Sequence, residues 1–317
     1  MSEQPRKRRV WLWIVVSLAI LFVGTICVFA SVVAALGAQG GGGFGGDAIA
    51  LIRVEGTLTE GEGGTDLFTS GALSGPIIDE IRSASDNPSV KAIVLRVNSP
   101  GGGIVASDDI YREVLRAREK GKKVVVSMGT LAASGGYYIS CAADRIIASP
   151  GTMTGSIGVI SMFPNTQDLM SKIGVQMTVI KSGAHKDEGS PFRPMTEEEM
   201  SYFQSMIDQM YGQFVDVVAK GRNMDVETVR RLGDGRVYTG QSALQLGLVD
   251  ELGDLQHTID VAAKMGGIRG KPRIIEHRRP SFLTSLFGSA ARSISQLSPT
   301  YIFANEGRAT LQYLYIQ

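Results

Sequence analysis

Cysteine and histidine are both scarce in this chain. Its 317 residues include two cysteines and three histidines. Cys27 stands in an apolar run and Cys141 among small residues, and neither has the CxxC or His-containing spacing of a metal site. We interpret both cysteines as small hydrophobic residues, and we expect neither a metal nor a cofactor. A histidine-based catalytic triad has few candidates: His185, His257 and His277.

An excess of charge of either sign is also missing. The formal net charge is +1, with 32 basic and 31 acidic residues. Binding to nucleic acid needs a basic surface that neutralises phosphates, so this balance argues against a nucleic-acid partner. The apolar fraction of 44% is ordinary for a globular protein.

Residues 10–38 contain no charged side chain. A helix needs about 20 apolar residues to cross a bilayer, so this run is long enough to span one with some tilt. Four basic residues precede it, and basic flanks stay in the cytoplasm. The sequence therefore predicts a cytoplasmic tail over 1–9, a single transmembrane anchor over 10–38, and a catalytic part outside the cytoplasm.

A cleaved signal peptide is the competing interpretation of the same segment. Ala35-Leu36-Gly37 forms a weak small-x-small cleavage site. The apolar core of a signal peptide is about 7–15 residues long, however, and this run is nearly twice that length. We therefore favour an uncleaved anchor. The glycine-rich residues 39–46 that follow have no side chains to pack, so we expect a flexible linker there.

From residue 47 to about 280 the pattern changes to that of an α/β domain. Apolar strands separated by helices of 10–15 residues indicate βαβ units and a parallel sheet covered on both faces. Ligands of such sheets bind beyond the carboxyl ends of the strands, which selects the loops after Val97 and Met128. The expected strands are 48–54, 92–97, 123–128, 146–148, 158–160 and 177–180, and the expected helices include 71–87, 106–120 and 134–143.

The chain is expected to be mainly helical from residue 195 to about residue 267. Thr196 and Glu199 have the spacing of a capping box, in which each side chain binds the other's backbone N–H. The tail over 281–317 is harder to place. Its apolar residues fit one helical face, which favours packing against the body or a neighbouring subunit over adhesion to a membrane.

Two loops combine small residues with a strand end. Residues 98–103, Asn-Ser-Pro-Gly-Gly-Gly, let backbone N–H groups turn toward a phosphate or an oxyanion. No Gly-Lys-Ser/Thr follows, which excludes a P-loop, and a plain turn remains an alternative. Ser134 stands between small residues at a strand-to-helix junction, where the Gly135 N–H would point toward a developing oxyanion. An ordinary N-cap serine fits the same position.

A nucleophilic serine needs a base. His257 and His277 lie in helical and basic surroundings that do not resemble a triad. Three other bases stand close together after an expected strand: Lys181, His185 and Lys186. The residues alone do not choose among them, and each is also an ordinary surface side chain.

Five motifs occur in order: NSPGGG, ASGGYY, TGSIGV, KSGAHKD and GRVYTGQSALQLGLVDELG. With them the chain resembles signal peptide peptidase A in its short single-domain bacterial form, from about Leu51 to Met265. The resemblance implies the crotonase/Clp-protease type of fold and a Ser/Lys dyad. It assigns Ser134 as nucleophile, Lys186 as general base and Ser156 as the residue that orients the lysine. Gly102 and Gly135 match the oxyanion hole, and Gly101 rivals Gly102.

The same resemblance implies a function and an assembly. The substrates would be signal peptides left in the bilayer after their release. A single copy of the fold would bring Lys186 of one subunit to Ser134 of the next, in a homo-oligomeric ring. A lysine acts as a base only when neutral, so Asp187 beside it should point away. An acyl-CoA enzyme of the crotonase type and a non-catalytic membrane scaffold are the rival functions.

Overall fold

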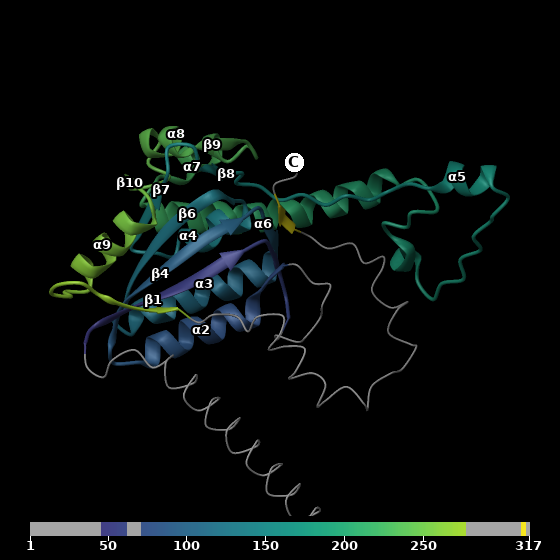
Figure 1. Cartoon of the computed structure of the whole chain (residues 1–317). Helices are drawn as coiled ribbons and strands as arrows, with labels where there is room; N and C mark the ends of the chain where they lie inside the picture. Colours follow the sequence, from purple (N-terminus) through teal and green to yellow (C-terminus); the bar gives the residue numbers. More distant parts are fainter. Residues whose placement is uncertain (1–45, 62–70, 277–311, 315–317) are drawn as a thin grey trace, which may run out of the picture. The chain divides into compact units, whose positions relative to one another are not determined.

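Three long apolar strands form the centre of the main sheet. In the computed structural model, β4 (Val90–Ser99) lies between β1 (Ala48–Glu55) and β6 (Lys123–Ala133), and both neighbours run parallel to it (Figure 1). Ile93 pairs with Ala50 on one side and with Val124 on the other. The predicted α/β fold with a parallel sheet is therefore confirmed.

Shorter strands extend this sheet and build a second one. The main sheet runs β10–β7–β6–β4–β1–β11, and β8 pairs with β6 in parallel and with β9 antiparallel. A four-stranded sheet runs β12–β5–β2–β3. The shorter strands are β2 (Thr57–Thr59), β3 (Gly71–Leu73), β5 (Gly101–Gly103), β7 (Arg145–Ala148), β8 (Met153–Gly155), β9 (Val237–Thr239), β10 (Glu251–Leu252), β11 (Arg273–Glu276) and β12 (Gln312–Leu314).

Helices cover both faces of the main sheet because successive strand side chains point in opposite directions. One face packs against α2 (Ser74–Asp86) and α3 (Ile104–Glu119), where Ile93 and Leu95 are fully buried. The other face carries Ala92 and Val94 and packs against α9 (Leu255–Met265). Burial on both faces explains why these strands are nearly continuous apolar runs in the sequence.

The remaining helices lie between β6 and β10 in the sequence. Helix α6 begins with the capping box that the sequence predicts: the Glu199 N–H donates to Thr196 Oγ1 at 3.1 Å, and the Thr196 N–H donates to Glu199 Oε2 at 2.8 Å. The C-terminal half of α6 is anchored in the core by Phe214, Val215 and Val218. The remaining helices are α4 (Gly135–Ser140), α5 (Gln167–Lys172), the 3-10 helix η1 (Ala184–Asp187), α6 (Glu197–Arg222), α7 (Val226–Leu232) and α8 (Gly240–Gln245).

Two predicted strands are wrong. Residues 158–160 contribute only an isolated bridge at Ile160, and residues 177–180 form no strand. Met177, Val179 and Ile180 are all exposed, so their apolar pattern does not record burial in a sheet. The sheet instead takes its next strand from β8, a short Met-Thr-Gly segment whose sequence gives no apolar run.

The structure describes residues 46–61, 71–276 and 312–314. The predicted cytoplasmic tail, the anchor over 10–38, nearly all of the linker and most of the C-terminal tail lie outside these residues. Within the described ranges, none of the helices combines the length and the apolar character needed to cross a bilayer.

Candidate functional site

The carboxyl ends of β4 and β6 lie side by side, at the edge where ligands of parallel sheets bind. Ser99 at the end of β4 pairs with Ala132 of β6. Ser99 is fully buried; its Oγ donates to Gly56 O at 2.6 Å and accepts from the Gly101 N–H at 3.1 Å. The glycine loop and the Ser134 turn, selected from the sequence on this rule, thus belong to one edge.

Ser134 occupies a strained turn between β6 and α4. Its backbone has φ 53° and ψ −119°, a conformation that non-glycine residues rarely adopt. The Ser134 N–H donates to Gly155 O at 2.8 Å, which helps to hold the turn. The Ser134 side chain makes no capping hydrogen bond to α4, so the interpretation of Ser134 as an ordinary N-cap is wrong. A sharp strand-to-helix turn of this kind presents a nucleophile in the α/β-hydrolases.

The Ser134 hydroxyl is fully buried and has no hydrogen-bond partner among the residues that the structure describes. A buried polar group is nearly always paired, because leaving it unpaired costs about 1–3 kcal/mol. The strained backbone and the unpartnered hydroxyl occur at the same residue. Such a combination is typical of a functional site, where a ligand or another chain completes the interactions.

Glycines let the loop after β4 approach the start of α4. A Cβ on Gly135 would lie 2.5 Å from Ser107 Oγ and 3.2 Å from the Gly102 nitrogen. A Cβ on Gly136 would lie 2.9 Å from the Ser99 carbonyl oxygen. Any side chain at these two positions would force the loop and the helix apart. The fold therefore brings Gly102, Gly135 and Ser134 into one small region.

Ser156 reaches the same region through β8. In the parallel pairing of β6 with β8, Ala133 pairs with Gly155, so Ser134 and Ser156 each follow a paired residue. Ser156 also has a positive φ, 51°, and is buried; its N–H donates to Arg236 O at 2.8 Å. Sequence reasoning placed Ser156 at the site through resemblance alone, and the strand register provides the physical connection.

Lys186 lies in η1. It is exposed, and its side chain makes no hydrogen bond or ion pair with any residue in the described part of the chain. Because Ser134 Oγ is also unpartnered, the two predicted dyad members do not bond to each other within this chain. Figure 1 shows α5, which lies between Ser156 and Lys186 in the sequence, well away from the carboxyl end of β6.

The two rival bases, unlike Lys186, are engaged. Lys181 Nζ donates to Asp187 Oδ1 at 2.5 Å and to Ala184 O at 2.7 Å. His185 Nδ1 lies 2.5 Å from a carboxylate oxygen of Glu188. Asp187 Oδ2 accepts from Arg193 Nε at 3.1 Å. Both Asp187 oxygens therefore face other cations, as expected from the sequence.

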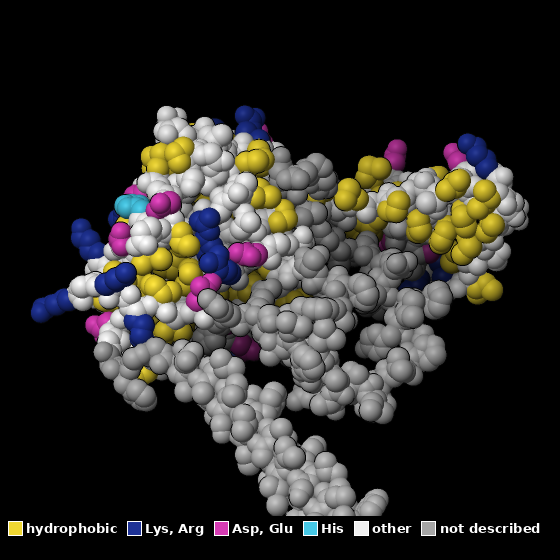
Figure 2. Space-filling view, viewed as in Figure 1, with side chains coloured by type: hydrophobic (Ala, Val, Ile, Leu, Met, Phe, Trp, Pro, Cys, Tyr) yellow, Lys and Arg dark blue, Asp and Glu magenta, His cyan; other side chains and the backbone are white. Residues whose placement is uncertain are grey.

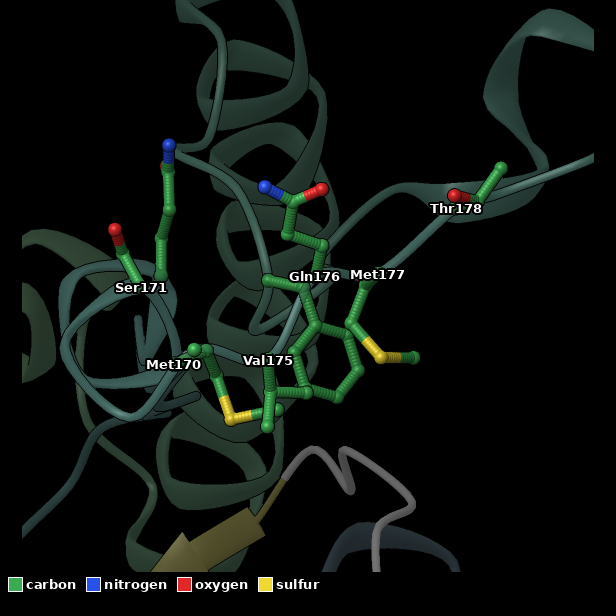
Figure 3. Close-up of a pocket in the computed structure, with 9 residues that line it drawn as sticks. Met170, Ser171, Val175, Gln176, Met177 and Thr178 are labelled. Carbon is green, nitrogen blue, oxygen red and sulfur yellow. The ribbon is translucent and has the colours of Figure 1, made fainter.

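A cavity of about 390 Å³ lies in the same segment as η1, next to α5. Figure 3 shows the Met170, Val175 and Met177 side chains gathered around it, with Ser171, Gln176 and Thr178 at its margin. None of the predicted site residues lines this cavity. In the described ranges, no three His, Cys, Asp or Glu side chains come together as a metal site.

The helix that follows Ser134, α4, contains Tyr137 and Tyr138 and ends at the buried Cys141. The Tyr137 hydroxyl donates to Leu248 O at 2.9 Å and the Tyr138 hydroxyl to Asp108 Oδ1 at 2.8 Å, which ties α4 to the body on two sides. Burial raises the pKa of the Cys141 thiol to about 12. A thiol with such a pKa is not a nucleophile at neutral pH, so Cys141 is packing.

Sequence reasoning missed the polar residues that support the site. Ser99 and Gly155 hold the two turns, and Arg193 binds the carboxylates of both Asp187 and Glu199. For Arg193 a partial signal exists, because it stands between a cluster of bases and a capping box. Its role depends on two carboxylates that meet only in the folded chain.

The fold and the site together define a parallel α/β domain that presents a strained serine beside glycine-rich backbone. Residues 72–154 match the sequence profile described as Clp protease. Residues 116–269 match the profile described as Peptidase family S49. Residues 116–269 are thus similar to an S49 peptidase domain, and the resemblance of the chain to signal peptide peptidase A is confirmed.

Named relatives agree with this family. A putative protease of Synechocystis sp. is 48% identical over 177 residues, which cover 56% of this chain and 64% of the relative. A putative signal peptide peptidase SppA of Enterococcus faecium is 42% identical over 187 residues, or 59% and 54% of the two chains. Protease 4 of Haemophilus influenzae is 41% identical over 217 residues, or 68% of this chain and 34% of the relative. The chain thus spans less than two thirds of each relative.

Proposed function

We propose that this chain is a membrane-anchored serine endopeptidase that degrades signal peptides after their release, with Ser134 as nucleophile and Lys186 as general base. The observation that carries the proposal is Ser134 itself: a strained backbone and an unpartnered, buried hydroxyl beside the glycine loop. The S49 match supports the reaction class, and the printed name of the Enterococcus relative supports the substrate class. The uncharged run over 10–38 supports a single-pass anchor with the catalytic part outside the cytoplasm.

In the proposed reaction, neutral Lys186 takes the proton of Ser134 Oγ as Oγ attacks the scissile carbonyl carbon. The carbonyl oxygen becomes an oxyanion, stabilised by the backbone N–H groups of Gly102 and Gly135. The lysine then gives its proton to the leaving amine, and water repeats the sequence to release the acyl group. Ser156 orients the lysine amine. Gly102 is preferred to Gly101, because the Gly101 N–H already donates to Ser99 Oγ at 3.1 Å.

We infer that a second copy of the chain supplies the lysine. Ser134 and Lys186 both lack a partner within the described residues, as expected if each meets the other in a neighbouring subunit. The segment that carries Lys186 also exposes many apolar side chains, which gather over the α5 end in Figure 2. Burying such a surface favours association. The exposed apolar residues of this segment are Met162, Leu169, Ile173, Val175, Met177, Val179 and Ile180. A head-to-tail contact of this kind closes into a ring when the rotation between neighbouring subunits divides a full turn evenly.

The edge of β5 is the proposed site for the substrate backbone. Gln312–Leu314 pair antiparallel with Gly101–Gly103, and β12 also lies against α3 and α4. An extended segment thus fits beside the glycine loop, next to the helix that Ser134 precedes. Peptides are commonly bound as an added strand on a sheet edge, where main-chain hydrogen bonds provide the affinity. A substrate would take the place of β12.

A fluorophosphonate probe tests the reaction class, because it labels only an activated serine nucleophile. We expect the chain to react at Ser134, and mass spectrometry of the labelled peptide would locate the adduct. An acyl-CoA enzyme or a non-catalytic scaffold would stay unlabelled. Labelling at another serine, or none in a preparation that hydrolyses peptides, would contradict the assignment.

His185→Ala and Lys181→Ala should keep substantial peptidase activity. His185 faces Glu188 and Lys181 faces Asp187, so neither is free to accept the Ser134 proton. We expect kcat/KM to fall by less than about tenfold in each variant, since exposed ion pairs contribute little. Steady-state kinetics on a signal-peptide substrate would measure this. If His185→Ala were inactive and Lys186→Ala active, a Ser-His mechanism would replace the proposed dyad.

A further inference from the structure

A single arginine joins the 3-10 helix that carries Lys186 to the start of α6. Arg193 binds Asp187 of η1 twice: its Nε donates to Oδ2 at 3.1 Å, and an Nη donates to the Asp187 backbone carbonyl at 2.9 Å. On its other side it binds both carboxylate oxygens of Glu199, one of them at 2.9 Å. A guanidinium has the planar, multi-donor geometry needed to hold two carboxylates at once.

Glu199 is a firm anchor for this bridge. It is buried, and its side chain also accepts the Thr196 N–H within the capping box of α6. The bonds from Arg193 and Thr196 hold the pKa of the Glu199 carboxyl at about 2, so it stays charged at neutral pH. Because α6 is packed into the core through Phe214 and Val218, the bridge connects η1 to the body of the protein.

We propose that Arg193 is a positioning residue for Lys186: it fixes η1 against the first turn of α6 and keeps the Asp187 carboxylate turned away from the lysine amine. The inference rests on the proposed function, in which Lys186 must be neutral to act as a base. Within the described residues, η1 has no buried side chain to pack against the core. Its contacts with Arg193 therefore provide the attachment to α6.

The placement of Asp187 matters because it is the residue next to Lys186. A carboxylate close to an amine stabilises the charged ammonium form, so the amine loses its proton only at higher pH. Arg193, and after it Lys181, hold the pKa of the Asp187 carboxyl well below its usual range, so it stays charged at neutral pH. The other charged groups around η1 are His185 with Glu188, and Glu199 of α6, which is bound by Arg193.

The test is a double-mutant cycle read through the pH dependence of kcat/KM, which reports ionisations of the free enzyme. In Arg193→Met, Asp187 Oδ1 keeps its bond to Lys181, but Oδ2 loses its partner and becomes free to face Lys186. We expect the ascending limb to move to higher pH by about one unit, the lower end of what a nearby opposite charge produces. In Asp187→Asn no carboxylate remains, so the limb should not move upward. In the double variant the limb should coincide with that of Asp187→Asn.

Controls separate charge from simple loss of structure. Arg230→Met removes a surface arginine that pairs with Glu227 at 3.7 Å, and it should leave the profile unchanged. Arg193→Lys should shift the ascending limb upward by less than Arg193→Met does, because a lysine keeps the positive charge but does not bridge two carboxylates as a guanidinium does. If Arg193→Met does not fold, Arg193→Lys provides the test. Its smaller upward shift should vanish when Asp187→Asn is added.

Two outcomes would overturn the inference. One is an ascending limb in Arg193→Met that coincides with the wild type, and the other is an upward shift that persists when Asp187 is also replaced. Neither outcome affects the proposed base. That proposal would fail separately, through an active Lys186→Ala variant, so the two failures are distinguishable.

Discussion

Ser134→Ala should abolish peptide hydrolysis without unfolding the protein. As the proposed nucleophile, Ser134 forms the covalent bond to the substrate, and its loss should lower kcat/KM by at least about 10⁴-fold, as for other members of a catalytic unit. The fold should persist because Ser134 Oγ has no hydrogen-bond partner among the described residues and makes no helix cap. Alanine keeps the Cβ, so the strain at φ 53° is almost unchanged. Kinetics, circular dichroism and thermal unfolding would measure these effects.

Ser140→Ala is a matched control in the next helix. Ser140 is also fully buried, but its Oγ donates to the Gly136 carbonyl at 2.7 Å. Removing this hydroxyl should cost about 1 kcal/mol of unfolding free energy while leaving hydrolysis nearly intact. Ser134→Ala should thus lower activity but not stability, whereas Ser140→Ala, only six residues away, should lower stability but not activity. Hydrolysis by a well-folded Ser134→Ala protein would eliminate Ser134 as the nucleophile.

The centre of the fold was predictable because the burial of each element is visible in the apolar pattern of its own residues. β1, β4 and β6 are buried on both faces and read as apolar runs, and α3 shows the amphipathic period of a helix on a sheet. Residues 177–180 have the same apolar character, but Met177, Val179 and Ile180 are exposed, so the strand predicted from this pattern is wrong. Apolar residues that are exposed on the surface of the chain look identical, in sequence, to residues that pack within it.

The short strands and the supporting contacts were not predictable for a different reason. β5 and β8 are glycine-containing triplets that become strands only because β2, β6 and β12 pair with them. Ser134 was found from its small neighbours, but its φ of 53° follows from the register of β6 with β8 and the Gly155 carbonyl. Such features depend on residues distant in sequence, and no local pattern encodes them.

Mixing two inactive variants should restore activity if the dyad forms between subunits. Ser134→Ala lacks the nucleophile and Lys186→Ala lacks the base, so each alone should be inactive. In a head-to-tail ring built from an equal, random mixture, about a quarter of the junctions would join an intact Ser134 to an intact Lys186. Activity should therefore recover to about a quarter of the wild-type value. The reason lies in the structure: both side chains lack a partner among the residues described in one chain.

The mixing experiment needs evidence that subunits exchange, which two differently tagged variants would provide by co-purification. A mixture of tagged and untagged Ser134→Ala is the control; it should exchange equally and stay inactive. If the dyad formed within one chain, every site in the mixture would lack one member. Exchange without recovered activity would then place Ser134 and Lys186 in the same subunit, and the segment from Ser156 to Lys186 would have to fold back onto the edge where β4 and β6 end.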